Sequence, residues 1–171
     1  MPHPVVAGLL WNVQLQYKGR SWMLVQLALA TAMVIMTVLV HLFGLAMLMR
    51  VLRSHTRIFR KLAIMPLTLL LAATIGIIMI HTLEIWLYAL LYLQLGAFGH
   101  FEQALYFSTV TYATIGYGDV VMPHEWRILG AIEGAAGIIM LGWSTAFLIS
   151  LLTQLKLIGH DWLSMTKEER P

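Results

Sequence analysis

Three long apolar segments and one short apolar segment alternate with polar stretches along the chain. The long segments cover residues 21–50, 62–95 and 127–156, and each exceeds the roughly 20 residues that a helix needs to cross a bilayer. The short segment, residues 101–113, cannot span and follows a break at Gly96 to Gly99, which predicts a re-entrant helix. We therefore predict an all-α integral membrane protein with three transmembrane helices and one re-entrant helix.

The polar stretches set the expected topology. Residues 1–20 mix aromatic and basic side chains and predict either an interfacial segment or a disordered end. Residues 51–61 form the most basic connector, which the positive-inside rule places in the cytoplasm. With three crossings, the N-terminus is then expected outside the cell and the tail, residues 157–171, in the cytoplasm. The spanning segments lack the regularly spaced arginines of a voltage sensor.

Composition supports a membrane location and narrows the possible chemistry. The chain has 171 residues, of which 60% are hydrophobic and 11% charged, and its mean hydropathy is +0.80. Its expected partner is the lipid bilayer, because so much apolar surface exceeds what a water-soluble core buries. The net charge of +3 does not indicate a nucleic-acid partner, since the basic residues lie beside membrane segments. Without cysteine, the chain forms no disulfide and no zinc–thiolate site.

The stretch after the re-entrant helix reads Thr-Ile-Gly-Tyr-Gly-Asp. Gly116 and Gly118 tolerate positive φ, and such residues let successive carbonyl groups point in one direction. A row of carbonyls, with the hydroxyl of Thr114 at one end, offers oxygen ligands to a desolvated cation, while Ile115 and Tyr117 point away into a packed wall. Because one chain supplies only part of such a cage, we predict a ring of copies. A glycine-rich turn between two helices is the alternative.

The same stretch resembles the selectivity-filter signature of potassium channels. Residues 67–153 are also similar to the pore module of that family in the order of their parts. The resemblance implies an outer helix at 62–95, a pore helix at 101–113, a filter at 114–119 and an inner helix at 127–156. It further implies a homotetramer in which K⁺ is coordinated by the filter residues Thr114, Ile115, Gly116, Tyr117 and Gly118.

Residues around the filter have expected supporting roles by the same resemblance. Tyr106 and Phe107 fall where the family carries an aromatic pair that braces the filter from outside. Asp119 falls at the filter-flanking acid, whose expected role is a hydrogen bond behind the filter mouth. Two positions depart from the commonest pattern of the family: Ala113 stands where a threonine is frequent, and Val110 stands where some bacterial members carry a glutamate that pairs with the acid.

The inner helix carries two further positions of interest. Gly137 falls at the gating-hinge glycine of the family, although small residues also allow close helix packing in lipid. Thr145 falls where a cavity-lining threonine is common. Ser144, beside it, is expected either to face water or to bond back to the preceding turn.

The apolar segments carry ionisable residues away from their ends, namely His41, His81, Glu84 and Glu133. His41 is expected to be a hydrogen-bonded packing residue. His81 and Glu84 are three residues apart on one helix face, and Glu133 lies at a comparable depth in the inner helix. Because an intramembrane charge is costly, we predict that Glu133 meets His81 or Glu84. Such a cluster would be either a structural clamp or a proton sensor.

The predicted function is therefore a potassium-selective channel, without enzymatic activity and without a cofactor other than the permeant K⁺. A less selective monovalent cation channel and a non-conducting accessory channel subunit are the alternatives. An intramembrane metalloenzyme would need more ligands than His81 and Glu84 provide. The first helix is additional to the simplest two-helix channels, and nothing in the sequence assigns its role.

Overall fold

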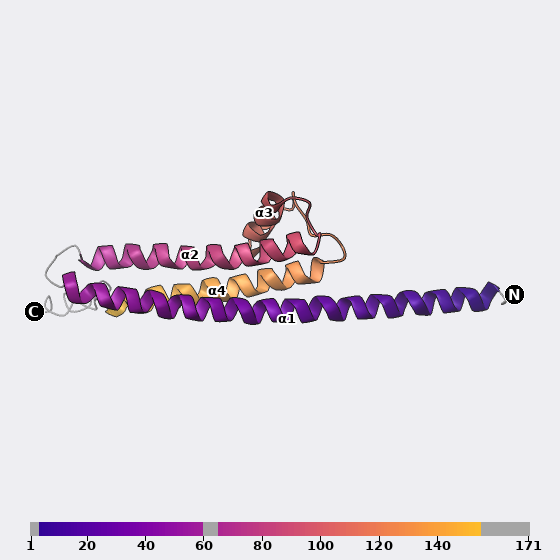
Figure 1. Cartoon of the computed structure of the whole chain (residues 1–171), viewed down its shortest axis with the longest axis horizontal. Coiled ribbons are helices and arrows are strands. Elements are labelled where there is room, and N and C mark those ends of the chain that lie inside the picture. The colour runs from indigo at the N-terminus through magenta and orange to yellow at the C-terminus, as the bar shows by residue number, and fades with distance from the viewer. Residues whose placement is uncertain (1–3, 60–64, 155–171) are drawn as a thin grey trace, which may run out of the picture. The chain divides into compact units, whose positions relative to one another are not determined.

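The computed structural model describes the backbone of residues 4–59 and 65–154, and the side chains of residues 22–54 and 67–154. These residues form four helices, α1 (Pro4–Phe59), α2 (Met65–Gln94), α3 (Phe101–Tyr112) and α4 (Arg127–Gln154), and no strand occurs among them (Figure 1). Three helices are long and apolar enough to cross a membrane, over Trp22–Ser54, Leu67–Gln94 and Arg127–Gln154. The predicted all-α fold with three membrane-spanning helices is confirmed.

Helix α1 is longer than predicted at both ends. Its helical backbone includes residues 4–20, which we predicted as an interfacial or disordered segment. It also continues to Phe59, through most of the stretch that we predicted as a connector. No glycine or proline occurs between Gly44 and Pro66, and the arginines of that stretch are good helix formers. The predicted tail, residues 157–171, lies outside the described residues.

The other helix boundaries lie close to the predicted ones and have local causes. Gly96, with φ of 67°, ends α2, because the amides of Ala97 and Gly96 donate to the carbonyls of Tyr92 and Leu93 at 3.0 and 3.1 Å. This pair of bonds is a Schellman motif, which requires a left-handed residue at its centre. Helix α3 begins after His100, whose backbone is extended, and it is the shortest of the four described helices (Figure 1).

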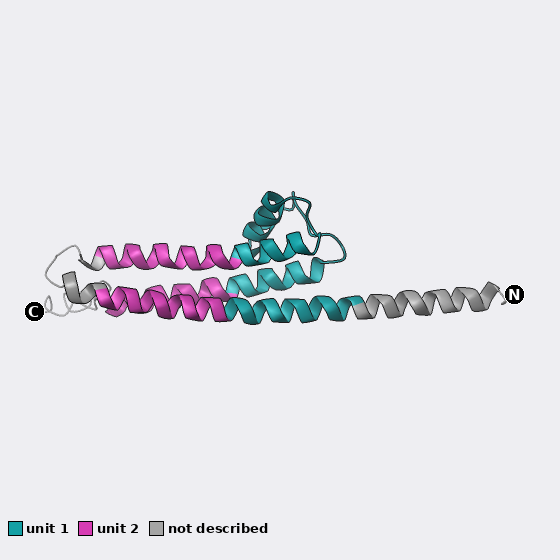
Figure 2. Ribbon diagram, viewed as in Figure 1, with its two compact units in different colours: residues 1–38, 85–138 teal, residues 39–84, 139–171 magenta. Residues whose placement is uncertain are grey.

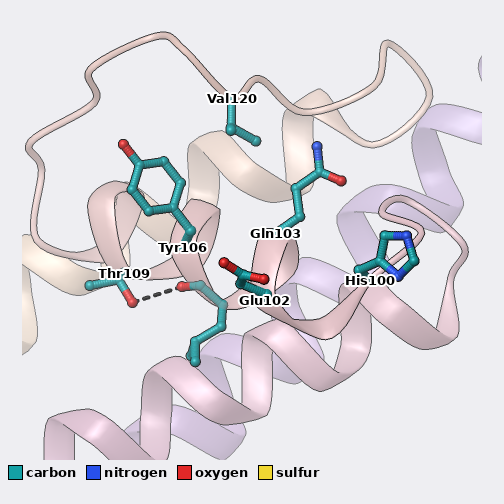
Figure 3. Close-up of a pocket in the computed structure, with 7 residues that line it drawn as sticks. His100, Glu102, Gln103, Tyr106, Thr109 and Val120 are labelled. Carbon is teal, nitrogen blue, oxygen red and sulfur yellow. Dashed lines mark hydrogen bonds between the residues drawn. The ribbon is translucent and has the colours of Figure 1, made fainter.

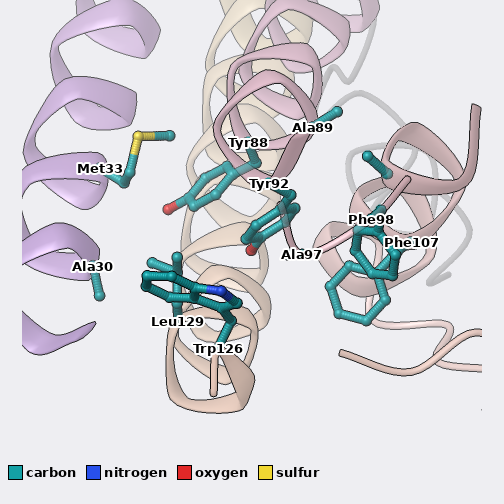
Figure 4. Packing of buried hydrophobic residues seen from close by; sticks show 11 residues of the cluster. Ala30, Met33, Tyr88, Ala89, Tyr92, Ala97, Phe98, Phe107, Trp126 and Leu129 are labelled. Atoms are coloured by element: carbon teal, nitrogen blue, oxygen red, sulfur yellow. The ribbon is translucent and has the colours of Figure 1, made fainter. Parts of the chain in front are cut away.

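The chain divides into two compact units, and the boundaries fall within α1, α2 and α4 (Figure 2). Unit 1 comprises residues 1–38 and 85–138, so it contains α3 and the loops on either side of it. Its core is an aromatic cluster in which Tyr92, Phe98 and Phe107 have ring centroids 5.2 to 6.2 Å apart (Figure 4). Such tilted and edge-on pairs add to the stability that apolar burial provides.

Helix α1 contacts the start of α4 within unit 1. The indole of Trp22 donates to the carbonyl of Glu125 at 3.0 Å, and its ring lies 5.1 Å from that of Trp126. The side-chain oxygen of Gln26 accepts from the amide of Ile128 at 3.2 Å. That amide belongs to the first turn of α4, where no intrahelical partner exists, so α1 caps α4.

Unit 2 comprises residues 39–84 and 139–171. Here α1 and α2 interlock through small residues. A side chain at Gly44 would meet Ile80 at 2.8 Å, and a side chain at Gly76 would meet Leu48 at 2.5 Å. Each helix therefore receives a branched side chain of the other over one of its glycines. We call this pair of contacts the glycine interlock; it is the small-residue packing that associates helices in lipid.

Candidate functional site

The C-terminus of α3 is tied directly to the loop that follows it. The amide of Thr114 donates to the carbonyl of Thr111 at 3.0 Å. The amides of Ile115 and Gly116 both donate to the carbonyl of Val110, at 2.8 and 3.1 Å. These bonds satisfy carbonyls that a helix end would otherwise leave without partners. The loop thus begins in a fixed position at the negative end of the helix dipole.

The loop backbone alternates in handedness. Thr114, Gly116 and Gly118 have φ of 59°, 55° and 79°, whereas the residues between them keep negative φ. Positive φ at both glycines is as expected from the sequence, but positive φ at Thr114 is not. A β-branched residue in this region is an outlier, and such strain persists only where the surroundings enforce it. Here the bonds from the loop amides back to α3 enforce it.

The carbonyl oxygens of this loop are available for ligation. Within the described part of the chain, no backbone amide donates to the carbonyls of residues 114–118. The whole stretch is exposed in the single chain, and Ile115 and Tyr117 expose 51% and 71% of their surface. The packed wall that we predicted around these two side chains is therefore not supplied by the chain's own helices. Unpaired carbonyls at membrane depth need water, a cation or another copy of the chain.

Tyr106 holds the far end of the loop. Its hydroxyl donates to the Oδ2 of Asp119 at 2.7 Å. This hydrogen bond lowers the pKa of Asp119 and raises the pKa of Tyr106. Phe107, the other member of the expected aromatic pair, lies instead in the aromatic cluster of unit 1, with its ring 5.7 Å from that of Tyr92. The two neighbours thus face opposite sides of α3, one toward the loop and the other toward the core.

An open hollow of about 680 Å³ lies on the loop side of α3 (Figure 3). Tyr106 and Val120 form part of its wall, and the wall is completed by His100, which precedes α3, and by the α3 residues Glu102, Gln103, Leu105 and Thr109. The hydroxyl of Thr109 is occupied by a bond to the carbonyl of Leu105 at 2.7 Å. The hollow therefore presents a mixed polar and apolar surface beside the Tyr106–Asp119 bond.

The two positions singled out on α4 have different surroundings. A side chain at Gly137 would overlap the backbone carbonyl of Tyr112 at the end of α3, and it would lie 3.0 Å from the Cα of that residue. This close approach is what the packing alternative for Gly137 requires. Thr145 is exposed in the single chain, and its hydroxyl donates to the carbonyl of Leu141 at 2.9 Å.

The prediction that Glu133 meets His81 or Glu84 is wrong. Both of its oxygens are satisfied within unit 1, where Oε2 accepts from the hydroxyl of Tyr92 and Oε1 from that of Ser108, each at 2.5 Å. The sequence prediction considered only ionisable partners for Glu133, whereas the structure pairs it with two hydroxyl donors. Both hydroxyls are visible in the sequence as groups that can donate to a carboxyl group.

His81 and Glu84 belong to a separate polar cluster in unit 2. The Oε2 of Glu84 lies 3.0 Å from the Nδ1 of His81, as their spacing predicts, but its Oε1 lies 3.0 Å from the Nδ1 of His41. The Oγ of Ser144 completes a ring, 2.9 Å from the Nε2 of His81 and 3.4 Å from that of His41. We call these four residues the histidine ring. His41 is indeed hydrogen-bonded, whereas Ser144 neither faces water nor bonds back.

Comparisons with known proteins agree with this arrangement. A family model described as "Ion channel" matches residues 67–154, which include α2, α3, the loop after α3 and α4 but not α1. No match was found among curated proteins or among solved structures. The family match covers half of the chain and coincides with the helix, short helix, loop and helix described above. The chain is therefore a multi-pass membrane protein that belongs to the ion channel family.

Proposed function

We propose that the protein is a potassium-selective channel whose filter consists of residues 114–118 from four identical chains. The observation that carries this proposal is the alternating backbone of the loop, with positive φ at Thr114, Gly116 and Gly118. Alternating handedness turns successive carbonyls toward one side, which is the arrangement that replaces the hydration shell of a cation. The unpaired carbonyls of residues 114–118 supply the ligands.

Four copies are part of the proposal because one chain leaves the loop bare. Ile115 and Tyr117 need an apolar surface, and the hollow beside Tyr106 offers space for a neighbouring chain. Thr145, exposed on α4, would line a water-filled cavity of the conduction pathway. Passive conduction needs no cofactor and no chemical step, and Asp119 acts only through its bond to Tyr106.

The test is cation flux into liposomes that contain the purified protein. Wild type is expected to carry K⁺ in strong preference to Na⁺, and to migrate as a tetramer after cross-linking. Gly116→Ala is expected to abolish the selective flux, because a side chain at φ of 55° costs about 1–2 kcal/mol for each chain of the ring. Gly99→Ala is the matched control, since Gly99 has open space around it and no positive φ.

The two alternatives give different results in the same experiment. A less selective cation channel would pass Na⁺ and K⁺ at similar rates in the wild type. An accessory subunit would fold and assemble but give no flux alone at any pH. Either result would contradict the proposal of a potassium-selective channel, while leaving the membership of the ion channel family intact.

A further inference from the structure

The histidine ring collects side chains of the kinds that bind transition metals. His41 of α1 and His81 and Glu84 of α2 each offer one ligand atom, and these atoms lie within 4.8 Å of one another. All three residues are buried. Two histidines and one glutamate, with a fourth position for a non-protein ligand, form a known type of zinc site. From the sequence we counted only His81 and Glu84, and His41 supplies the third ligand.

The separations within the ring fit a shared ion. Each histidine Nδ1 lies 3.0 Å from one oxygen of Glu84. Zinc bonds of about 2.0–2.1 Å in a tetrahedral site place neighbouring ligand atoms about 3.3 Å apart. The three ligand atoms lie within 4.8 Å of one another, so the side chains would close around an ion that takes the place of the bridging protons. The imidazole rings lie with centroids 5.3 Å apart and are already turned toward the same carboxyl group.

The opposite side of each imidazole has a partner of the kind that metal sites use. The Nε2 atoms of His81 and His41 lie 2.9 and 3.4 Å from the Oγ of Ser144. Metal-bound histidines usually donate their other N–H to such a group, which fixes the tautomer and the ring orientation. Trp143 stacks on His41 with an interplanar angle of 21° and limits the rotation of that ring.

Charge also fits a divalent ion. An ionised glutamate in a spanning segment needs a compensating charge. Two neutral imidazoles and the Glu84 carboxylate around a divalent cation leave one positive charge. A small anion in the fourth position, such as hydroxide, makes the whole site neutral.

We propose that His41, His81 and Glu84 bind one divalent transition metal ion of the zinc type per chain. The ion fastens α1, which lies outside the matched residues 67–154, to α2, which lies inside them. The site holds the additional helix on the channel module. The proposal does not depend on potassium selectivity, and its tests use no flux measurement.

The experiment loads purified, metal-stripped protein with Co²⁺, a visible probe of zinc sites, or with Zn²⁺. We expect about one ion per chain after desalting, visible absorption of tetrahedral rather than hydrated Co²⁺, and a higher unfolding temperature with Zn²⁺. Glu84→Gln removes the anionic ligand but keeps the size and hydrogen-bonding capacity of the side chain. Both this variant and His41→Ala should lose the retained ion and the absorption.

Ser144→Ala tests the partner behind the imidazoles. It leaves every ligand in place, and we expect Co²⁺ affinity to fall about 10–100-fold, as for other changes around metal ligands. The matched control is the double variant His100→Ala/His124→Ala, which removes exposed histidines outside the ring and should bind as wild type does.

Three results would overturn the metal site. The first is wild-type protein that retains no more Co²⁺ than a folded Glu84→Gln variant. The second is bound Co²⁺ with the spectrum of the hydrated ion, and the third is loss of binding in the exposed-histidine control. In each case the ring is a hydrogen-bonded clamp only. If His41→Ala fails to fold, the wild-type spectrum and Glu84→Gln still decide the question.

Discussion

At Gly137, the space for a side chain is occupied by the backbone of another helix. A Cβ atom there would lie 2.9 Å from the carbonyl carbon of Tyr112, and a backbone cannot rotate away as a side chain can. We predict that Gly137→Ala destabilises the protein by about 1–3 kcal/mol, the usual cost of overpacking. Denaturant unfolding of the purified protein measures this change. Since Tyr112 ends α3, the variant should also disturb the loop after α3 and, if that loop is the filter we propose, reduce flux.

Gly142→Ala is the matched control for Gly137→Ala. Gly142 lies on the same helix, but nothing occupies the space of its side chain. Alanine there should be neutral or stabilise the helix by up to about 1 kcal/mol, because alanine is the better helix former. Equal destabilisation by the two variants would mean that α4 must bend at its glycines, which is the hinge alternative.

The bond between Tyr106 and Asp119 gives the loop a defined pH dependence. Because the Tyr106 hydroxyl lowers the pKa of Asp119, the bonded carboxylate persists to a lower pH than an ordinary aspartate. The stability that the ionised carboxylate of Asp119 adds to the folded chain is complete above the unfolded pKa of about 3.9. It is lost as pH falls through the lower pKa of the folded state. In Tyr106→Phe this protection is gone, so flux should decline at a higher external pH than in wild type.

Asp119→Asn is the control for this pH dependence. The substitution removes the titrating group, so flux through this variant should lack the acid-dependent step that wild type shows below about pH 4. An acid step in Tyr106→Phe that coincides with the wild-type step would contradict the role of this hydrogen bond.

Among the helices, a single buried carboxyl group joins α2, α3 and α4 within unit 1. Glu133 of α4 accepts from Tyr92 of α2 and from Ser108 of α3. The Oγ of Ser108 also lies 3.0 Å from the carbonyl of Ile85. A serine hydroxyl carries one proton and serves one acceptor at a time. A protonated Glu133 would supply the second proton and would avoid a charge in a spanning helix.

Glu133→Gln and Glu133→Leu distinguish the two protonation states. Glutamine places an N–H donor beside Ser108 and a carbonyl beside Tyr92, so it imitates the neutral acid and should cost less than about 1 kcal/mol. Leucine leaves the buried hydroxyls without this partner and should cost about 1–3 kcal/mol. Comparable losses for both variants, measured by unfolding, would indicate an ionised Glu133.

For the whole molecule, the three helices able to span a membrane predict that the two ends of the chain lie on opposite sides of it. The basic stretch near the end of α1 favours the cytoplasm for that end, which predicts an external N-terminus and an internal C-terminus. Because the chain contains no cysteine, a single introduced cysteine can be labelled to check this topology. A membrane-impermeant thiol reagent applied to intact cells should label Gly99→Cys but label Ser164→Cys only after permeabilisation. The reverse pattern would invert the topology.

The sequence predicted most features that depend on neighbouring residues and missed those that depend on residues far apart in the chain. Segment hydropathy located the spanning helices, and local glycine chemistry predicted positive φ at Gly116 and Gly118, since both depend on neighbouring residues. The partners of Glu133 depend on contacts between helices, which spacing along one helix does not reveal. Positive φ at Thr114 depends on the bonds from the loop amides back to α3, which residue type alone does not predict. His41 was visible as a lone titratable residue, but its proximity to Glu84 required the packing of α1.

The glycine interlock has an evolutionary consequence. Gly44 accommodates Ile80, and Gly76 accommodates Leu48, so the size of the residue at one position restricts the size permitted at its counterpart. Descendants of this gene that keep α1 should change the two members of a pair together, a larger residue at 44 accompanying a smaller one at 80. Lineages that lose α1 are released from this constraint, and large residues at position 76 should accumulate in them.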